Sequence, residues 1–96
     1  MSKRDLSLKK YNIGTYRYRE LLYFCLQYEE FKKNSKENAE LIENTAKEAA
    51  GTLWEQLLKN VSLGIVYEHM PIPVGRRQFY EMRQKFFWLL SQRKGV

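Results

Sequence analysis

The sequence contains one cysteine and one histidine among its 96 residues. A single cysteine, Cys25, cannot close a disulfide within the chain, and with one histidine it cannot assemble a zinc site. No apolar run approaches the roughly 18 residues that a membrane span needs, and residues 1–5 lead into no apolar, signal-like segment. We therefore expect a cytoplasmic protein, inside a host cell, with no metal, cofactor, disulfide or membrane segment.

Positive charge is in excess, with 17 Lys and Arg against 11 Asp and Glu and a net charge of +6. This charge is segregated, because residues 1–19 carry +5, residues 20–70 carry −4 and residues 71–96 carry +5. A basic segment attracts polyanions, and nucleic acid is the first polyanion to consider. The N-terminal charges have an alternative interpretation: they belong to a solvent-exposed helix face, as in many helical proteins, and bind no partner.

Apolar residues recur at spacings of three and four, which predicts helices and no strands. We expect an all-α fold, in which residues 1–96 form one domain: a small bundle of four to five helices with a C-terminal helix-turn-helix-like unit. The expected helices cover residues 15–33, 36–50, 52–63, 65–70 (a short helix) and 76–93.

Boundary signals place several helix ends. Thr15 is the expected N-cap of the first helix, and Thr52 with Glu55 fits a capping box for the third. The helix of residues 36–50 carries only a thin apolar stripe of mostly alanine, so we expect it to be exposed and weakly anchored.

The last elements follow a helix-turn-helix layout. Such a unit needs a scaffold helix, a turn that fixes the angle, and polar side chains early in the second helix. Residues 65–93 supply these parts, although the turn with Pro71 and Pro73 is longer and stiffer than the simplest turn of three or four residues. The prolines favour extended backbone before them, so the last helix begins after Pro73, with Gly75 as its N-cap.

The last helix carries side chains suited to DNA. Arginine can pair with guanine O6 and N7, glutamine with adenine N6 and N7, and basic residues with phosphates. Its predicted DNA-binding residues are Arg76, Arg77, Gln78, Tyr80, Arg83, Gln84 and Lys85, of which Arg77 and Gln78 rank first for bases. Phe79, Met82 and Phe86 are expected to face the core. The alternative is a helix that serves only packing or protein contact.

A second basic cluster, residues 9–11 and 16–19, interleaves aromatic with basic side chains, a combination that can stack on bases and hold phosphates. Arg17 and Arg19 therefore join the predicted DNA-binding set. The alternative is that these tyrosines cover the edge of a small domain. The first helix is expected to dock against the last one, which would bring both basic ends onto one face.

Two stretches carry a resemblance to known proteins. Residues 67–80, YEHMPIPVGRRQFY, and residues 85–90, KFFWLL, resemble small proteins encoded in phages and prophages of Gram-positive bacteria, and residues 10–13 and 18–21 fit the same proteins. The chain is similar to phage late-gene transcriptional regulators whose last helices resemble a sigma-factor DNA-binding region. The resemblance implies an origin in a mobile element, and residues 34–50 contribute least to it.

Two hypotheses for function follow. The first is a phage-type transcriptional regulator that lays the helix of residues 76–93 in the major groove of double-stranded DNA. A homodimer is one arrangement for such a regulator, and Trp88 is the candidate contact between its two subunits. The alternative is a mobile-element adaptor or inhibitor that binds a host defence protein, and a phage assembly factor is a third reading. We expect no enzymatic activity, because His69 has no catalytic partner at a recognisable spacing.

Overall fold

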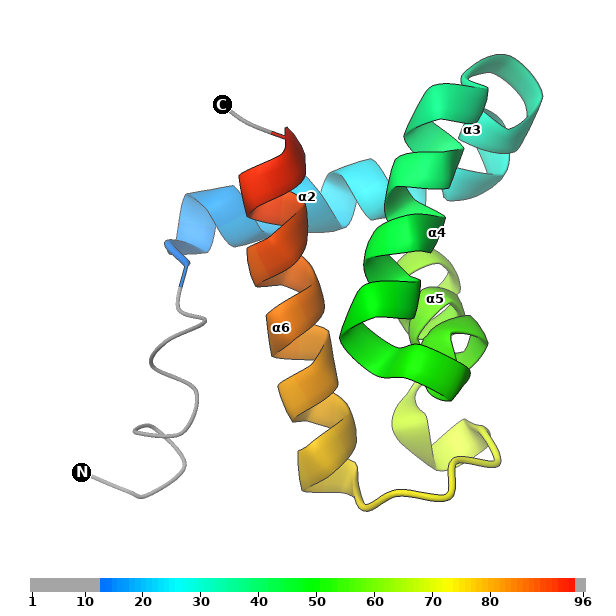
Figure 1. Ribbon diagram of the computed structural model, residues 1–96, viewed down its shortest axis with the longest axis vertical. Coiled ribbons are helices and arrows are strands. Elements are labelled where there is room, and N and C mark those ends of the chain that lie inside the picture. Colours follow the sequence, from blue (N-terminus) through cyan, green and yellow to red (C-terminus); the bar gives the residue numbers. More distant parts are fainter. Residues whose placement is uncertain (1–12, 95–96) are drawn as a thin grey trace.

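The computed structural model describes residues 13–94, which form an all-α bundle without a β-strand (Figure 1). Its α-helices are α2 (Thr15–Leu26), α3 (Tyr28–Asn34), α4 (Lys36–Ala50), α5 (Trp54–Leu63) and α6 (Arg76–Lys94), with short 3-10 turns η2 (Gly51–Leu53) and η3 (Tyr67–His69). The predicted all-α class is confirmed. The scaffold helix expected at residues 65–70 is absent, so in the C-terminal helix-turn-helix-like unit α5 takes its place, and residues 64–75 connect α5 to α6. Within residues 13–94, no helix is both long and apolar enough to cross a membrane.

Helix α4 lies at the centre of the bundle, where it packs along α6 and also contacts α3 and α5 (Figure 1). Its buried residues are mostly small: Ala39, Ile42, Thr45, Ala46 and Ala50. Because the side chains at a contact set the distance between two helix axes, an alanine-rich face allows close approach. The expectation that residues 36–50 are exposed and weakly anchored is therefore wrong, since the thin stripe is a central packing surface.

Aromatic side chains of α6 fill the core beside α4. Phe79 and Phe86 are fully buried, as predicted, Phe87 is buried with them, and Met82 is half-buried against the core. Helix α2 docks on α6, as expected, and the ring of Tyr18 lies edge-on to that of Phe87, with 5.0 Å between the ring centroids.

The helix expected over residues 15–33 is broken at Gln27 into α2 and α3. The Gln27 amide bonds the carbonyl of Phe24, three residues back, at 3.2 Å, which tightens the last turn of α2. The Gln27 side chain donates instead to the carbonyl of Tyr23, also at 3.2 Å. The chain changes direction here, and α3 turns away from α2 toward α4 (Figure 1).

The first helix begins at residue 15, as predicted, but its N-cap is displaced by one residue, and the third helix begins two residues later than predicted. Gly14 is the N-cap of α2, and Thr15 is its first helical residue. The capping box at Thr52 is absent, because Thr52 lies within η2 and α5 begins at Trp54 without a side-chain cap. Gly51 has a φ of 56° and a ψ of −124°, a conformation that favours glycine, and the turn it makes places Thr52 ahead of the true helix start.

The short helix expected over residues 65–70 is only the 3-10 turn Tyr67–His69. Gly64, with a φ of 73°, ends α5 in the left-handed conformation. Met70 is extended, as predicted for a residue before a proline such as Pro71. Only the five residues 65–69 lie between these two stops, and Val66 is itself extended, so the segment contains no more than the single 3-10 turn.

Candidate nucleic-acid interface

The exposed residues of α6 lie at its two ends: Arg76, Arg77 and Gln78 at the start, Gln92 and Arg93 near the end. The residues between these ends are half-buried or buried, because α6 packs against both α2 and α4. A helix laid lengthwise in a groove needs an exposed face along its length. The geometry therefore offers the first turn of α6, presented end-on, rather than the whole helix of residues 76–93.

The connection before this turn is fixed to the bundle at several points. The hydroxyl of Tyr67 donates to the carbonyl of Val74 at 2.6 Å, which closes the loop across its two prolines. The ring of Tyr67 also packs on buried Phe79, with 5.6 Å between ring centroids. The carbonyl of Gly75 accepts the Phe79 amide at 3.0 Å, as expected of the predicted N-cap. The start of α6 is thus held in a defined place.

Asn60 joins α5 to both the connection and α6. Its side-chain nitrogen donates to the carbonyl of Ile65 at 3.0 Å, and its side-chain oxygen accepts from Nε of Arg83 at 2.7 Å. The Arg83 guanidinium also lies over the rings of Tyr18, at 5.6 Å, and Phe87, at 5.0 Å. Arg83, one of the predicted DNA-binding residues, is therefore occupied as a link between α2, α5 and α6.

Replacing Arg83 with methionine is expected to lower the free energy of unfolding by about 1–3 kcal/mol, because it leaves the partly buried Asn60 amide without its charged partner. Urea unfolding followed by circular dichroism measures this loss. Arg77→Met, an exposed change on the same helix, should stay within about 0.5 kcal/mol. Equal stability of the two variants would show that Arg83 is not a structural link.

The arginines of the first turn each lie near a carboxylate. Nε of Arg76 donates to Glu68 at 2.8 Å, and Nε of Arg77 lies 3.8 Å from a carboxylate oxygen of Glu81. Both arginine side chains are largely exposed, at 65% and 62%. Such exposed pairs contribute little to stability, and a further anionic or polar ligand can still reach each guanidinium group.

The other predicted residues of α6 are less accessible. Tyr80 is half-buried, with its ring edge-on to Phe79 at 5.5 Å and the Arg76 guanidinium 5.0 Å from its centroid. Gln84 and Lys85 are half-buried on the middle of the helix, and Gln84 has interactions within the bundle. Tyr80 therefore lies beside Arg76 at the start of α6, whereas Gln84 and Lys85 lie further along the helix.

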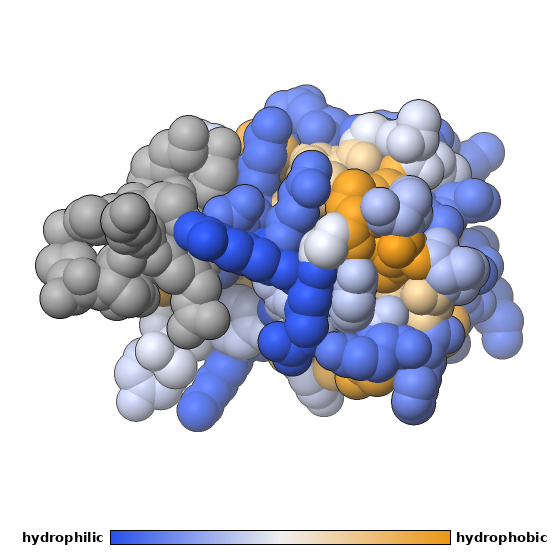
Figure 2. Space-filling model, turned by 90° about the horizontal axis from the view of Figure 1, so that it is seen from below, coloured by the Kyte–Doolittle hydropathy of each residue, from blue (hydrophilic) through white to orange (hydrophobic). Residues whose placement is uncertain are grey.

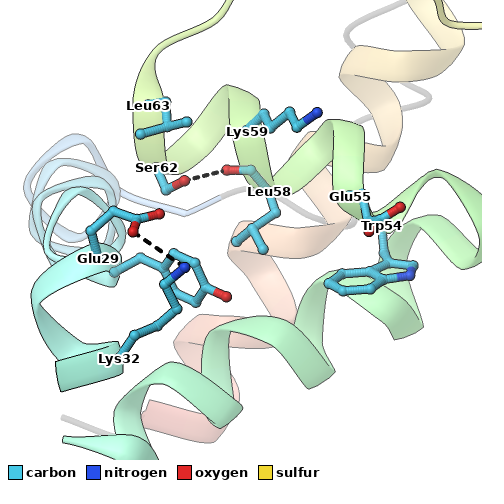
Figure 3. Close-up of a pocket in the computed structure, with 9 residues that line it drawn as sticks. Glu29, Lys32, Trp54, Glu55, Leu58, Lys59, Ser62 and Leu63 are labelled. Atoms are coloured by element: carbon cyan, nitrogen blue, oxygen red, sulfur yellow. Dashed lines mark hydrogen bonds and ion pairs between the residues drawn. The ribbon is translucent and has the colours of Figure 1, made fainter.

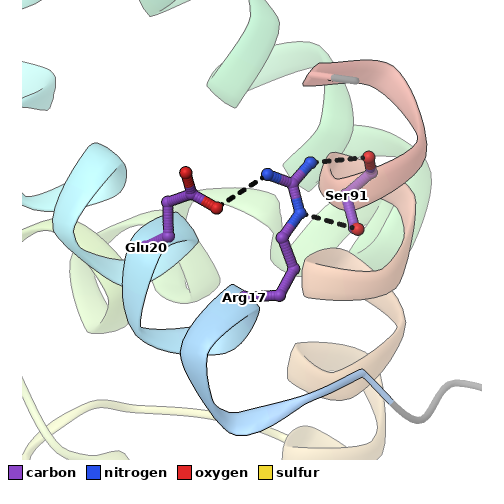
Figure 4. A network of polar contacts seen from close by, with 3 residues as sticks. All are labelled: Arg17, Glu20 and Ser91. Atoms are coloured by element: carbon purple, nitrogen blue, oxygen red, sulfur yellow. Dashed lines mark hydrogen bonds and ion pairs between the residues drawn. The ribbon is translucent and has the colours of Figure 1, made fainter. Parts of the chain in front are cut away.

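Arg17 is tied to the far half of α6 (Figure 4). Its Nε donates to the Ser91 hydroxyl at 3.1 Å, another guanidinium nitrogen to the Ser91 carbonyl at 3.0 Å, and the third to Glu20 at 2.9 Å. Arg19 is exposed beside it in α2. At 1.5 Å per residue, Ser91 lies about 22 Å along the helix from Arg76. The two arginine groups therefore lie toward opposite ends of α6 and do not form one face.

Figure 2 looks onto the end of the molecule that carries the connection and the start of α6. Strongly hydrophilic side chains lie there beside a hydrophobic area. Val66 of the connection is 42% exposed. Residues 9–11 of the second predicted basic cluster lie outside the described residues, and Arg17 of that cluster is bonded to Ser91 and Glu20. The start of α6 is therefore the candidate interface that the described residues present.

A shallow hollow between α3 and α5 is a surface that the sequence did not predict (Figure 3). Its volume is about 240 Å³, and it is lined by Tyr28, Glu29, Lys32, Trp54, Glu55, Leu58, Lys59, Ser62 and Leu63. Lys32 pairs with Glu29 at 3.2 Å and lies 5.2 Å from the Tyr28 ring. Burial, and then the hydrogen bond to Glu43, raise the pKa of Tyr28. No sequence signal marks this hollow, because it depends on how α3 turns at Gln27.

Cys25 is buried, as the sequence predicts for a small apolar side chain. Burial raises the pKa of its thiol to about 12, although the nearby positive charge of Arg83 acts in the opposite direction. Because only the thiolate is reactive, an aromatic disulfide reagent at about pH 8 should leave the folded protein unmodified and react only after urea unfolding. Rapid reaction of the folded chain would contradict this burial.

Comparison with known protein families, curated proteins and solved structures finds no match. The class is therefore defined by the fold and the site alone: an all-α bundle with a helix-turn-helix-like unit, whose last helix presents two arginines and a glutamine on its exposed first turn.

Proposed function

We propose that this protein binds duplex DNA through the first turn of α6 and acts as a transcriptional regulator. The observation that carries the proposal is the exposure of Arg76, Arg77 and Gln78 on a turn that the bundle and the connection hold in place. In helix-turn-helix proteins, the N-terminal residues of the second helix contact base edges. The exposed first turn of α6 offers those N-terminal residues.

The chemistry of the turn also supports DNA as the partner. The first N–H groups of a helix have no partner within the helix, and the helix dipole places partial positive charge there, which suits a phosphate. Arginine and glutamine are the side chains that recognise guanine and adenine in the major groove. The resemblance of residues 67–80 to small phage-encoded proteins favours an origin in a mobile element.

A single turn offers a small contact area, so the regulator is expected to act as a homodimer or with a second protein on DNA. One module of this size contributes an interface of about 600–1,000 Å². Trp88, the sequence candidate for a dimer contact, is half-buried and already has interactions within the bundle.

The experiment that tests the proposal is selection of bound duplexes from a random library at two salt concentrations. A regulator should enrich one sequence, and the enrichment should persist at the higher salt. Binding that is independent of sequence and disappears at higher salt would contradict the proposal, because it would show only the attraction of a basic protein to phosphate.

A second candidate function is an adaptor or inhibitor that binds a host protein. It is favoured by the exposed apolar side chains of Leu26, Leu63 and Val66, which are 50%, 54% and 42% exposed. If the duplex selection enriches nothing, while Leu63→Ser abolishes a stable complex with a host protein, the adaptor function takes precedence. Retention of that complex by Leu63→Ser would count against a contact through Leu63.

A further inference from the structure

Arg76 is held by two different contacts, although it is a long and exposed side chain. Its Nε donates to a carboxylate oxygen of Glu68 at 2.8 Å. Its guanidinium carbon lies 5.0 Å from the ring centroid of Tyr80, within the range of a cation–π contact. Glu68 belongs to the turn η3 and Tyr80 to α6, so two separate elements position one guanidinium group.

The two contacts leave the outer edge of the guanidinium available. Glu68 bonds Nε alone, and within residues 13–94 the two terminal amino groups of Arg76 have no hydrogen-bond partner. A guanidinium group presents its N–H donors in a flat fork that can bind two acceptors in parallel. The edge that remains free is thus suited to two acceptors in one plane.

We propose that Arg76 recognises a guanine in the major groove, with Glu68 and Tyr80 as positioning residues. This inference rests on the proposed function, and it names the base that the site selects. Guanine O6 and N7 form the acceptor pair that matches an arginine fork. A side chain that is already positioned loses less conformational freedom on binding, so the specific contact is strengthened.

Arg77, which the sequence ranks first for bases, is held less well. The 3.8 Å between its Nε and Glu81 is longer than a hydrogen bond, and both groups are on the same helix. A mobile arginine suits a phosphate, whose contacts tolerate several geometries. The structure therefore shifts the base-reading role from Arg77 to Arg76.

The test replaces each guanine of the selected duplex in turn with 7-deazaguanine, which lacks the N7 acceptor. At one guanine, the parent protein should lose affinity several-fold, which is less than the loss of a whole bidentate contact because O6 remains as an acceptor. Arg76→Ala removes the whole contact, so it should bind the unmodified duplex roughly 5- to 150-fold more weakly and should be insensitive to the change at that guanine. Lys33→Ala, which removes the same charge from the exposed surface of α3, is the matched control.

The positioning residues are tested by the ratio of specific to non-specific affinity. Glu68→Gln should lower this ratio several-fold, while its affinity for random duplex rises because a negative charge is lost. Tyr80→Phe should retain the ratio because the ring remains, whereas Tyr80→Leu should lose it. Glu40→Gln, an exposed change of the same charge on α4, should leave the ratio unchanged.

The outcomes separate this inference from the function on which it rests. If the parent protein selects no sequence, the proposed function fails and the inference fails with it. If the parent selects a sequence but Arg76→Ala keeps its sensitivity at every guanine, only the inference is overturned. The same holds if Arg76→Ala weakens binding equally on all sequences and reduces the salt dependence, because that behaviour identifies a phosphate contact.

Discussion

Replacing Phe86 with alanine is expected to lower the free energy of unfolding by about 3–5 kcal/mol. The Phe86 side chain is fully buried, and its ring packs edge-on against Phe87 at 5.1 Å. Because α6 packs against both α2 and α4, a cavity at this position affects the contacts of three helices. A domain of this size typically has only about 5–15 kcal/mol of stability, so the loss is a large part of the total.

Urea unfolding followed by circular dichroism measures this effect. Gln78→Ala, a change on the exposed first turn of the same helix, should alter stability by no more than about 0.5 kcal/mol. A Phe86→Ala variant as stable as the Gln78→Ala variant would mean that α6 does not form the core of the bundle.

The double variant Arg77→Ala with Gln78→Ala is expected to bind the selected duplex at least about 5-fold more weakly. The base contact of Gln78 is worth about 1–3 kcal/mol, and the phosphate contact of Arg77 is lost with it. Loss of the Arg77 charge should also reduce the steepness with which the logarithm of the affinity falls with the logarithm of the salt concentration, by about one. Fluorescence anisotropy over a range of salt concentrations measures both quantities.

The matched control for that variant is Lys33→Ala with Asn34→Ala, which removes a cation and an amide from α3. This control should bind the duplex as the parent does, and both double variants should unfold at the same urea concentration. Equal loss of binding by the two double variants would show that DNA responds to overall charge and not to the first turn of α6.

Helix periodicity and breakers were sufficient to predict the all-α class, the extended Met70 and the buried Phe79 and Phe86. The role of α4 could not be predicted in this way. Alanine contributes little to an apolar pattern, and only the partner helix decides whether it marks an exposed or a tightly packed face. The break at Gln27 was also missed, because it depends on a side-chain amide that replaces one backbone hydrogen bond.

The candidate interface was only partly predictable for a related reason. Sequence spacing places Arg76, Arg77 and Arg83 together on a basic helix, but it does not reveal which of them the bundle engages. Arg83 bonds Asn60 on another helix, and Arg17 bonds Ser91, far away in the sequence. Such long-range polar contacts leave no local signature, so only the structure separates structural arginines from available ones.

An NMR titration of the ¹⁵N-labelled chain with the selected duplex tests most directly whether the first turn of α6 binds DNA. Chemical-shift changes should concentrate at the amides of Arg76, Arg77 and Gln78 and in the connection of residues 64–75. Changes concentrated on α3 and the hollow beside α5, or no changes at the first turn of α6 when DNA is bound, would contradict DNA binding by this turn.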